Sequence, residues 1–275
     1  MIVVLLGGFL GATLMRFAPG FGVDEEEIDT RLNRDSIQSL RRANRQDQHL
    51  LAFYLRYLRG LLRGDLGNSR TLERPVTQLL GERFPETLKS VGVALLVGWT
   101  LGLTLAVAVV MTRDWLVDAF ASLTVGALLC LPAAVLALLF LLERIPARLL
   151  LSLVVFPKVF RYSRNLLTRN AGLPHVLTAR AKGLNEWRVF AWHILPTAAP
   201  QLLALVGVSI SLAFAASIPM EALCDIPGIG QLAWKAALGR DLELLVNLTM
   251  IVTLVTLLAN SLSDFAAHTF RAGAA

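Results

Sequence analysis

The chain has little of what a soluble protein of its size contains. Charged residues make up 17% of its 275 residues and hydrophobic residues 55%, and its mean hydropathy is +0.61. This composition excludes an ordinary soluble domain. The two cysteines, Cys130 and Cys224, lie at different predicted membrane depths. They therefore predict neither a metal site nor a disulfide framework.

Several catalytic and nucleotide-binding motifs are also missing. The sequence has no Gly-x-x-x-x-Gly-Lys-[Ser/Thr], and no lysine follows a glycine, so the backbone cradle for nucleotide phosphates is absent. Any energy must come from outside the chain or from an ion gradient. There is no Gly-x-Ser-x-Gly or His-Glu-x-x-His, and none of the four histidines lies in a long apolar run. These absences argue against an intramembrane enzyme.

Long apolar runs are the main feature that the sequence does have. A run of about 18 apolar residues predicts a transmembrane helix. Ile2–Met15 is short, but it lacks the basic start and the cleavage site of a signal peptide, so it is interpreted as a helix. The chain is thus predicted to be an all-α membrane protein with about six transmembrane helices. The five other predicted spans are Val91–Met111, Ala119–Leu142, Leu149–Tyr162, Thr197–Met220 and Leu244–Leu262.

Charge predicts the topology. Between Lys158 and Trp192 there are seven Lys/Arg and one acidic residue, and such a short basic loop stays in the cytoplasm. Counting helices from it puts both termini inside, and residues 16–90 and 221–243 outside. The 16–90 stretch carries 13 Lys/Arg, but it is long and its 11 acids nearly neutralise it. The net charge of +6 is therefore attributed to membrane topology and not to nucleic-acid binding.

These patterns predict one membrane domain, 1–275. Its predicted parts are a first helix at 1–15, an extracytoplasmic segment at 16–90 and a five-helix core at 91–275. Within the extracytoplasmic segment, apolar residues recur at helical spacing from Phe53 to Leu62 and predict an amphipathic helix at the membrane surface.

A basic cytoplasmic segment, 164–196, carries the most informative pattern. Residues 175–182 have helical propensity, and Gly183 can take the positive φ that a sharp reversal between two helices needs. Asn185 is a good N-cap for the next helix, and Glu186 suits its first turn. The segment is therefore predicted to be a pair of short helices between two membrane helices.

The second short helix carries an apolar face that requires a partner. That partner could be this chain's own helix ends or a groove on another subunit, and the pattern leaves both open. Pro196 suits the first turn of the membrane helix that follows. The face consists of Trp187, Phe190, Ala191 and Ile194, at positions i, i+3, i+4 and i+7.

The segment closely resembles the cytoplasmic coupling motif of ABC importer permeases, which ends in a glycine, nine residues and Ile-x-Leu-Pro. Gly183 is followed by nine residues and then by His193–Pro196, with His193 in the place of the isoleucine. Leu177–Ala179 takes the place of Glu-Ala-Ala. The core Ala179–Leu184 is the variant of dipeptide, oligopeptide and nickel permeases. The resemblance implies that the ATPase-coupling residues are Ala179, Arg180, Ala181, Lys182, Gly183, Leu184, Trp187, Phe190 and Pro196.

Other short motifs resemble the same family in the same order. They are Ala18–Gly20, Arg63–Ser69 (RGDLGxS), Arg74–Val76 (RPV), Arg83–Leu88 (RxPxTL) and Glu221–Gly230. The last is similar to Glu-x-x-Phe-x-x-Pro-Gly-Leu-Gly, with Cys224 in the aromatic place.

The Glu221 loop is a candidate translocation or gate element. A carboxylate at the bilayer centre costs roughly 2.5–3.5 kcal/mol, so Glu221 must be paired, near water or at the interface. A structural cap or interface position and a role in lining the path both remain open. Pro227 and Gly228 signal a turn, Gly230 completes the motif, and residues 231–239 look like a short helix.

A second glycine pattern lies within the predicted Val91–Met111 helix. Gly98 and Gly102 are four residues apart, a spacing that lets helix backbones approach closely. The close approach could serve packing within the bundle or a subunit interface.

The resemblance implies a type I ABC importer permease bundle in the bacterial or archaeal cytoplasmic membrane, with more residues before the first helix than this chain has. The implied partners are a second homologous permease, two ATPase subunits that carry ATP and Mg, and an extracytoplasmic solute-binding protein. This chain would bind no cofactor or metal and catalyse no reaction. Peptides are the expected cargo, and nickel or another small solute is the alternative. An ion-coupled secondary transporter or channel would need mid-helix carboxylates or an inverted repeat, and neither is evident.

Overall fold

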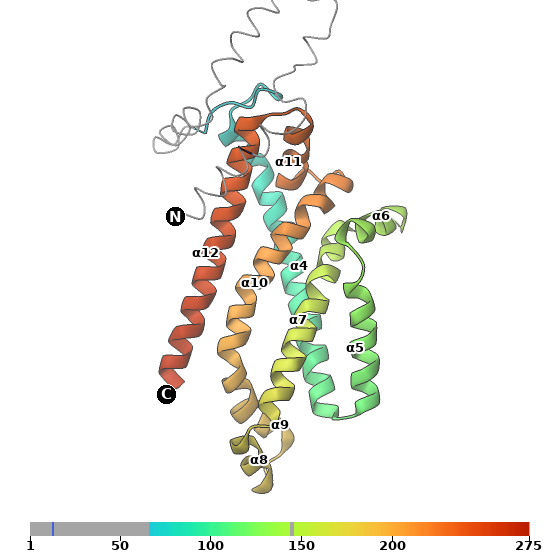
Figure 1. Cartoon of the computed structure of the whole chain (residues 1–275), viewed down its shortest axis with the longest axis vertical. Coiled ribbons are helices and arrows are strands. Elements are labelled where there is room, and N and C mark those ends of the chain that lie inside the picture. Colours follow the sequence, from blue (N-terminus) through green and yellow to red (C-terminus); the bar gives the residue numbers. More distant parts are fainter. Residues whose placement is uncertain (1–12, 14–65, 144–145, 275) are drawn as a thin grey trace, which may run out of the picture. The chain divides into compact units, whose positions relative to one another are not determined.

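The structure is a computed structural model that describes Thr13, residues 66–143 and residues 146–274, and these residues are mostly helical (Figure 1). Within these ranges no β-strand forms, and an isolated antiparallel bridge pairs Asn68 with Pro75. The helices are α4 (Val76–Thr112), α5 (Trp115–Leu129), α6 (Ala133–Glu143), α7 (Ala147–Ala171), α8 (Pro174–Ala181), α9 (Glu186–Val189), the π-helix η2 (Phe190–Ile194), α10 (Leu195–Leu223), α11 (Ile229–Leu238) and α12 (Leu242–Ala274).

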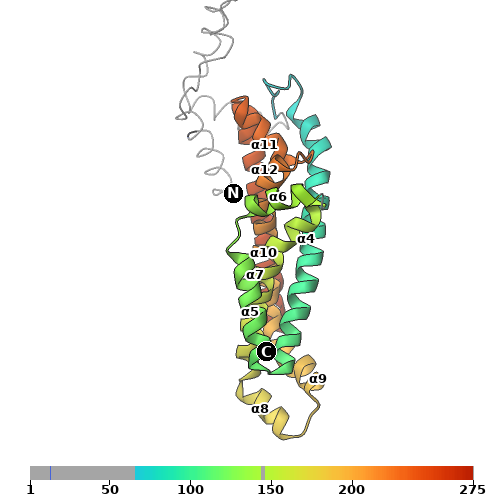
Figure 2. The same ribbon diagram turned by 90° about the vertical axis from the view of Figure 1, so that its right-hand side faces the viewer.

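The chain divides into two compact units. The first unit comprises Met1–Phe84 and Leu232–Leu254, and the second comprises Pro85–Gln231 and Val255–Ala275. In the second unit α10 and α5 pack on α7, and α6 packs on both α7 and α10. The short helices α8 and α9 lie together at one end of α7 and α10 (Figure 2).

A hydrophobic core holds this end of the second unit together. Val109 from α4, Leu166 from α7, Val176 from α8 and Ala198 from α10 are all buried in one cluster. Burying such side chains is worth about 1.5–3 kcal/mol each. The short helices are therefore stabilised by apolar packing against the membrane helices.

The glycine pair in α4 serves packing within this chain. A Cβ on Gly98 would lie 2.9 Å from the Val155 side chain of α7, and one on Gly102 would lie 2.9 Å from Val159. These distances are below ordinary contact, so α4 and α7 approach closely because both positions lack a side chain. This confirms the prediction of packing within the bundle.

Among the residues that the structure describes, three helices are long and apolar enough to cross a membrane: Val76–Thr112, Glu186–Leu223 and Glu243–Phe270. They contain the predicted spans Val91–Met111, Thr197–Met220 and Leu244–Leu262 and extend beyond both ends of each. The apolar pattern located these helices correctly but not their ends, because polar residues continue the same backbone hydrogen bonding beyond the apolar run.

The predicted span Ala119–Leu142 is wrong as a single helix. Two helices cover it, α5 and α6, with a break at Cys130–Pro132. Pro132 lacks a backbone N–H and disfavours helical geometry at Leu131, so the helix ends at this point although the apolar run continues. Trp115–Leu129 remains a shorter apolar helix.

Two other boundaries differ from expectation. The predicted span Leu149–Tyr162 lies within the continuous helix α7, which carries on through Lys158 and Arg161 to Ala171. The predicted boundary at residue 90 falls inside α4, which begins at Val76. The predicted helix Ile2–Met15, the amphipathic stretch 53–62 and the motif at Ala18–Gly20 lie outside the described residues, except for Thr13.

Candidate functional site

The predicted reversal between two short helices is present. Helix α8 ends at Ala181, Lys182 caps it, and Gly183 has a φ of +74°. A Cβ at Gly183 would meet no atom within 4 Å. The position therefore favours glycine for its backbone conformation and not for lack of space.

The second short helix begins as the sequence predicts. The Asn185 side chain accepts a hydrogen bond from the backbone N–H of Trp187 at 3.2 Å, and it caps α9. Glu186 occupies the first turn, where a carboxylate interacts favourably with the helix dipole. The prediction of Asn185 as N-cap is confirmed.

The predicted apolar face of this helix is divided. Phe190 and Ile194 are 7% and 2% exposed and belong to the core that also contains Leu166 of α7. Trp187 is 63% exposed, and its ring meets Phe190 edge-on at 6.2 Å between centroids. Phe190 therefore packs against its own chain, which is one of the two alternatives that the pattern left open, and its role in coupling stays a prediction.

A second exposed indole was not predicted from the sequence. Trp192 is 75% exposed and lies in η2. It follows Trp187 by five residues, a spacing that puts two residues on different faces of a regular α-helix. No sequence signal marked the π-helix in advance except Pro196, whose ring is incompatible with an uninterrupted α-helical turn before it.

Pro196 is the second residue of α10. Immediately before it, the backbone N–H of Leu195 bonds to Phe190 O, five residues back. The wider π turn accommodates the proline without a break in the chain direction. Pro196 thus opens the membrane helix, as predicted.

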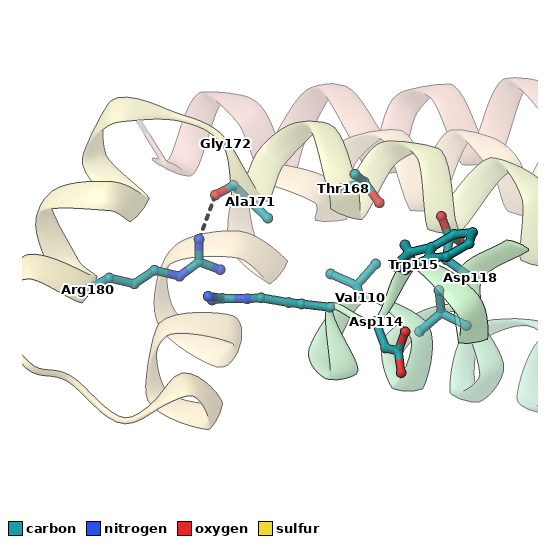
Figure 3. Close-up of a pocket in the computed structure, with 10 residues that line it drawn as sticks. Val110, Asp114, Trp115, Asp118, Thr168, Ala171, Gly172 and Arg180 are labelled. Atoms are coloured by element: carbon teal, nitrogen blue, oxygen red, sulfur yellow. Dashed lines mark hydrogen bonds between the residues drawn. The ribbon is translucent and has the colours of Figure 1, made fainter.

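The remaining candidate coupling residues surround the reversal. Ala179 is buried, Leu184 packs partly buried against the same core, and Ala181 and Lys182 are exposed. Arg180 reaches back from α8 and donates to Ala171 O at 3.1 Å (Figure 3). One face of the segment is therefore fixed to the bundle, and the tip at 181–183 is free for contact.

An open pocket of about 440 Å³ adjoins this segment (Figure 3). Its walls include Val110, Asp114, Trp115, Thr168 and Arg180. Both signs of charge occur in its lining, from Arg113 and Arg180 and from Asp114 and Asp118, so it offers no uniform charge to a ligand. We assign it no cargo.

The candidate gate loop is organised by Glu221. The carboxylate is 1% exposed, and its Oε2 accepts from Gly230 N–H at 2.7 Å and from the Thr87 hydroxyl at 3.0 Å. The Thr87 hydroxyl in turn accepts from Ile229 N–H at 2.8 Å. Glu221 therefore ties the start of α11 to α4 and α10 within the second unit.

The glycines of this loop serve close packing. A Cβ at Gly228 would overlap the Glu221 carboxylate and the Thr87 hydroxyl, and one at Gly230 would lie 2.6 Å from the Ile218 backbone. Pro227 is exposed beside them. The structure thus brings Glu221, Gly228 and Gly230 together, as the motif implies, and adds Thr87 from the RxPxTL motif.

One oxygen of Glu221 lacks a partner among the described residues. Oε1 is buried and receives no hydrogen bond there. An unsatisfied buried oxygen is costly, at roughly 1–3 kcal/mol. Both sequence-based readings of Glu221 therefore remain: Oε2 acts as a structural cap, and Oε1 is available to another group.

The first unit contains a second buried carboxylate that sequence reasoning missed. Asp241 accepts from the Ser69 hydroxyl at 2.6 Å, from Thr71 N–H at 3.2 Å and from Leu244 N–H at 3.0 Å. It thereby caps α12 and holds the turn after Gly67, whose φ is +73°. The Asp before an apolar helical run was an N-cap signal that could have identified it.

The described residues form a helical bundle with a basic helical reversal at one end, next to two exposed tryptophans. Comparison with known proteins gives the class of this protein. The family described as binding-protein-dependent transport system inner membrane component matches residues 98–273, more than half of the chain. The chain belongs to this family and is a multi-pass membrane protein.

Individual relatives are more specific. The oligopeptide transport system permease protein OppB of Salmonella typhimurium is 26% identical over 260 residues, which cover 87% of this chain and 84% of that protein. OppB of Haemophilus influenzae is 26% identical over 272 residues, covering 91% and 88%. A chain of the MetNI methionine ABC transporter in inward-facing conformations has a TM-score of 0.64 and 19% identity, and covers 70% of this chain. That likeness concerns the fold alone.

Proposed function

We propose that this chain is a transmembrane permease subunit of an ATP-driven importer, and that its cargo is peptides. The observation that carries the proposal is the helical reversal at Gly183, anchored by Phe190 and tipped by exposed Trp187. A large exposed indole on a short helix that follows the basic residues Arg180 and Lys182 favours a protein partner. The peptide cargo rests on the similarity to oligopeptide permeases.

The proposed arrangement has six membrane helices of the type I importer bundle. They are Ile2–Met15, α4, α5 with α6, α7, α10 and α12. Both termini and the 174–196 segment are cytoplasmic in this proposal, because the basic residues concentrate around that segment. The membrane is the cytoplasmic membrane of a bacterium or archaeon.

The proposed partners are a second homologous permease, two ATPase subunits with ATP and Mg, and an extracytoplasmic solute-binding protein. The candidate coupling residues contact an ATPase groove, chiefly through Trp187, and ATP binding moves the segment. Hydrolysis belongs to the ATPase and not to this chain.

The experiment is affinity purification of the complete importer from membranes, followed by transport of a labelled peptide into vesicles that contain ATP. We expect an ATPase and a solute-binding protein to co-purify, and peptide uptake to require ATP. Trp187→Ala should weaken ATPase retention by about tenfold, since interface indoles often contribute more than 1 kcal/mol. Phe190→Ala should instead lower the yield of folded permease, because that ring is buried. ATP-independent uptake, or a Trp187→Ala variant that retains the ATPase normally, would contradict the proposal.

A further inference from the structure

Three charged side chains form an ion group between the membrane helices and residues 174–196, which are called the coupling segment below. Glu186, the first residue of α9, accepts from Arg113 Nη2 at 2.7 Å on each of its two oxygens. Arg180 of α8 places its Nε 3.5 Å from the same carboxylate. A single carboxylate thus joins the first turn of α9, the last turn of α8 and the loop after α4.

Each arginine is also connected to the end of a membrane helix. Arg113 lies in the two-residue connection between α4 and α5 and has a φ of +54°, which is uncommon for a residue other than glycine. The next residue, Asp114, caps α5 by accepting from Leu116 N–H at 2.9 Å. Arg180 donates to Ala171 O at the end of α7 (Figure 3). The ion group therefore connects the ends of α4, α5 and α7 to α9.

The connection continues along the bundle. Arg164 of α7 forms an ion pair with Asp118 in the first turn of α5. A displacement of α9 would thus be passed to the α4–α5 connection and, through Arg180, to the end of α7. Hydrophobic contacts alone allow sliding, because they are not directional. Charge-assisted hydrogen bonds to a fixed carboxylate also restrict the angle between α9 and the α4–α5 connection.

We infer that Arg113, Glu186 and Arg180 are positioning residues that transmit the movement of the coupling segment to α4 and α7. This inference rests on the proposed function, because it assumes that an ATPase moves the segment. The Arg113–Glu186 pair is exposed, and such pairs contribute little to folding. The ion group is thus expected to matter for coupling more than for stability.

The test is a double-mutant cycle in the complete importer, reconstituted in vesicles. Arg113→Gln and Glu186→Gln should each lower the number of peptides transported per ATP hydrolysed, by roughly threefold, which is at the upper end for an exposed pair. Arg113→Gln with Glu186→Gln should be no worse than Glu186→Gln alone, because Glu186→Gln already removes the interaction that Arg113→Gln removes. ATPase co-purification and thermal stability of the complex should stay at the wild-type level.

Two further variants are the matched controls. Arg113→Lys retains the charge and should recover part of the ratio of peptides transported to ATP hydrolysed. Arg148→Gln removes another ion pair of α7, with Glu86, at a distance from the segment and should leave the ratio unchanged. Normal ratios in both single variants, additive losses in the double variant, or an equal loss in Arg148→Gln would overturn the inference. A wild-type complex without an ATPase would instead overturn the proposed function.

Discussion

The coupling segment and the Glu221 loop each contain a glycine and a carboxylate, but these residues lie in opposite environments. At Gly183 the backbone needs a positive φ and the surrounding space is empty. At Gly230 the φ is ordinary, and the space for a side chain is already filled by Ile218. The charged groups differ similarly, since Glu186 is paired at the surface and Glu221 is buried.

This contrast indicates different mechanical roles. A close-packed loop fixed by a buried carboxylate can move only as a unit with the helices that it joins. An exposed reversal with open space around it can meet a partner without repacking the core. The two regions are therefore expected to fail in different ways when their glycines and acids are replaced.

Gly230→Ala should have the largest effect on stability. The added methyl would meet the backbone of Ile218, which cannot rotate away, so we expect a loss of about 3 kcal/mol, near the upper end for overpacking. The measurement is the melting temperature of the purified permease. Gly92→Ala is the matched control, because a Cβ there meets nothing within 4 Å, and it should stabilise helix α4 by about 0.5–1 kcal/mol. Equal melting temperatures for the two variants would contradict the packing account.

Glu221→Ala should have the next largest effect. Removing the carboxylate leaves the N–H of Gly230 without its acceptor in a buried place, which costs about 1–3 kcal/mol. Glu221→Gln keeps one accepting oxygen and should melt close to the wild type. Peptide uptake by Glu221→Gln then separates the two roles. Normal uptake would mean that Glu221 is a structural cap only. Reduced uptake with normal stability would mean that its charge lines the translocation path.

The sequence predicted the helical class and the three long apolar helices that contain Val91–Met111, Thr197–Met220 and Leu244–Leu262, because long apolar runs have few other solutions. It also predicted the Gly183 reversal and the Asn185 cap, since both depend on local backbone chemistry. It did not predict the break at Pro132 within an apolar run, or the burial of Phe190, which depends on the register of a π-helix. It also missed Asp241, although its place before an apolar helical run was a local N-cap signal. The pairing of Glu221 with Thr87 and that of Asp241 with Ser69 join residues 134 and 172 positions apart, and such distant pairs leave no local pattern.

Replacing Gly183 should change the stability of the permease least, but it should reduce coupling to the ATPase most. Gly183→Val places a β-branched residue at a φ of +74°, at a cost of about 1–2 kcal/mol confined to the reversal. Gly183→Asn is the control, because asparagine tolerates this conformation and a side chain has room there. No such control is possible at Gly230, because a Cβ at that position already lies 2.6 Å from the Ile218 backbone.

We have proposed that the 174–196 segment couples this permease to a separate ATPase. ATPase co-purification and peptide-stimulated ATP hydrolysis, measured side by side for the wild type, Gly183→Asn and Gly183→Val, test this coupling. We expect Gly183→Asn to behave like the wild type. We expect Gly183→Val to reach the membrane and to melt within a few degrees of the wild type, yet to lose ATPase retention or stimulation. Full retention and full stimulation in Gly183→Val would contradict it.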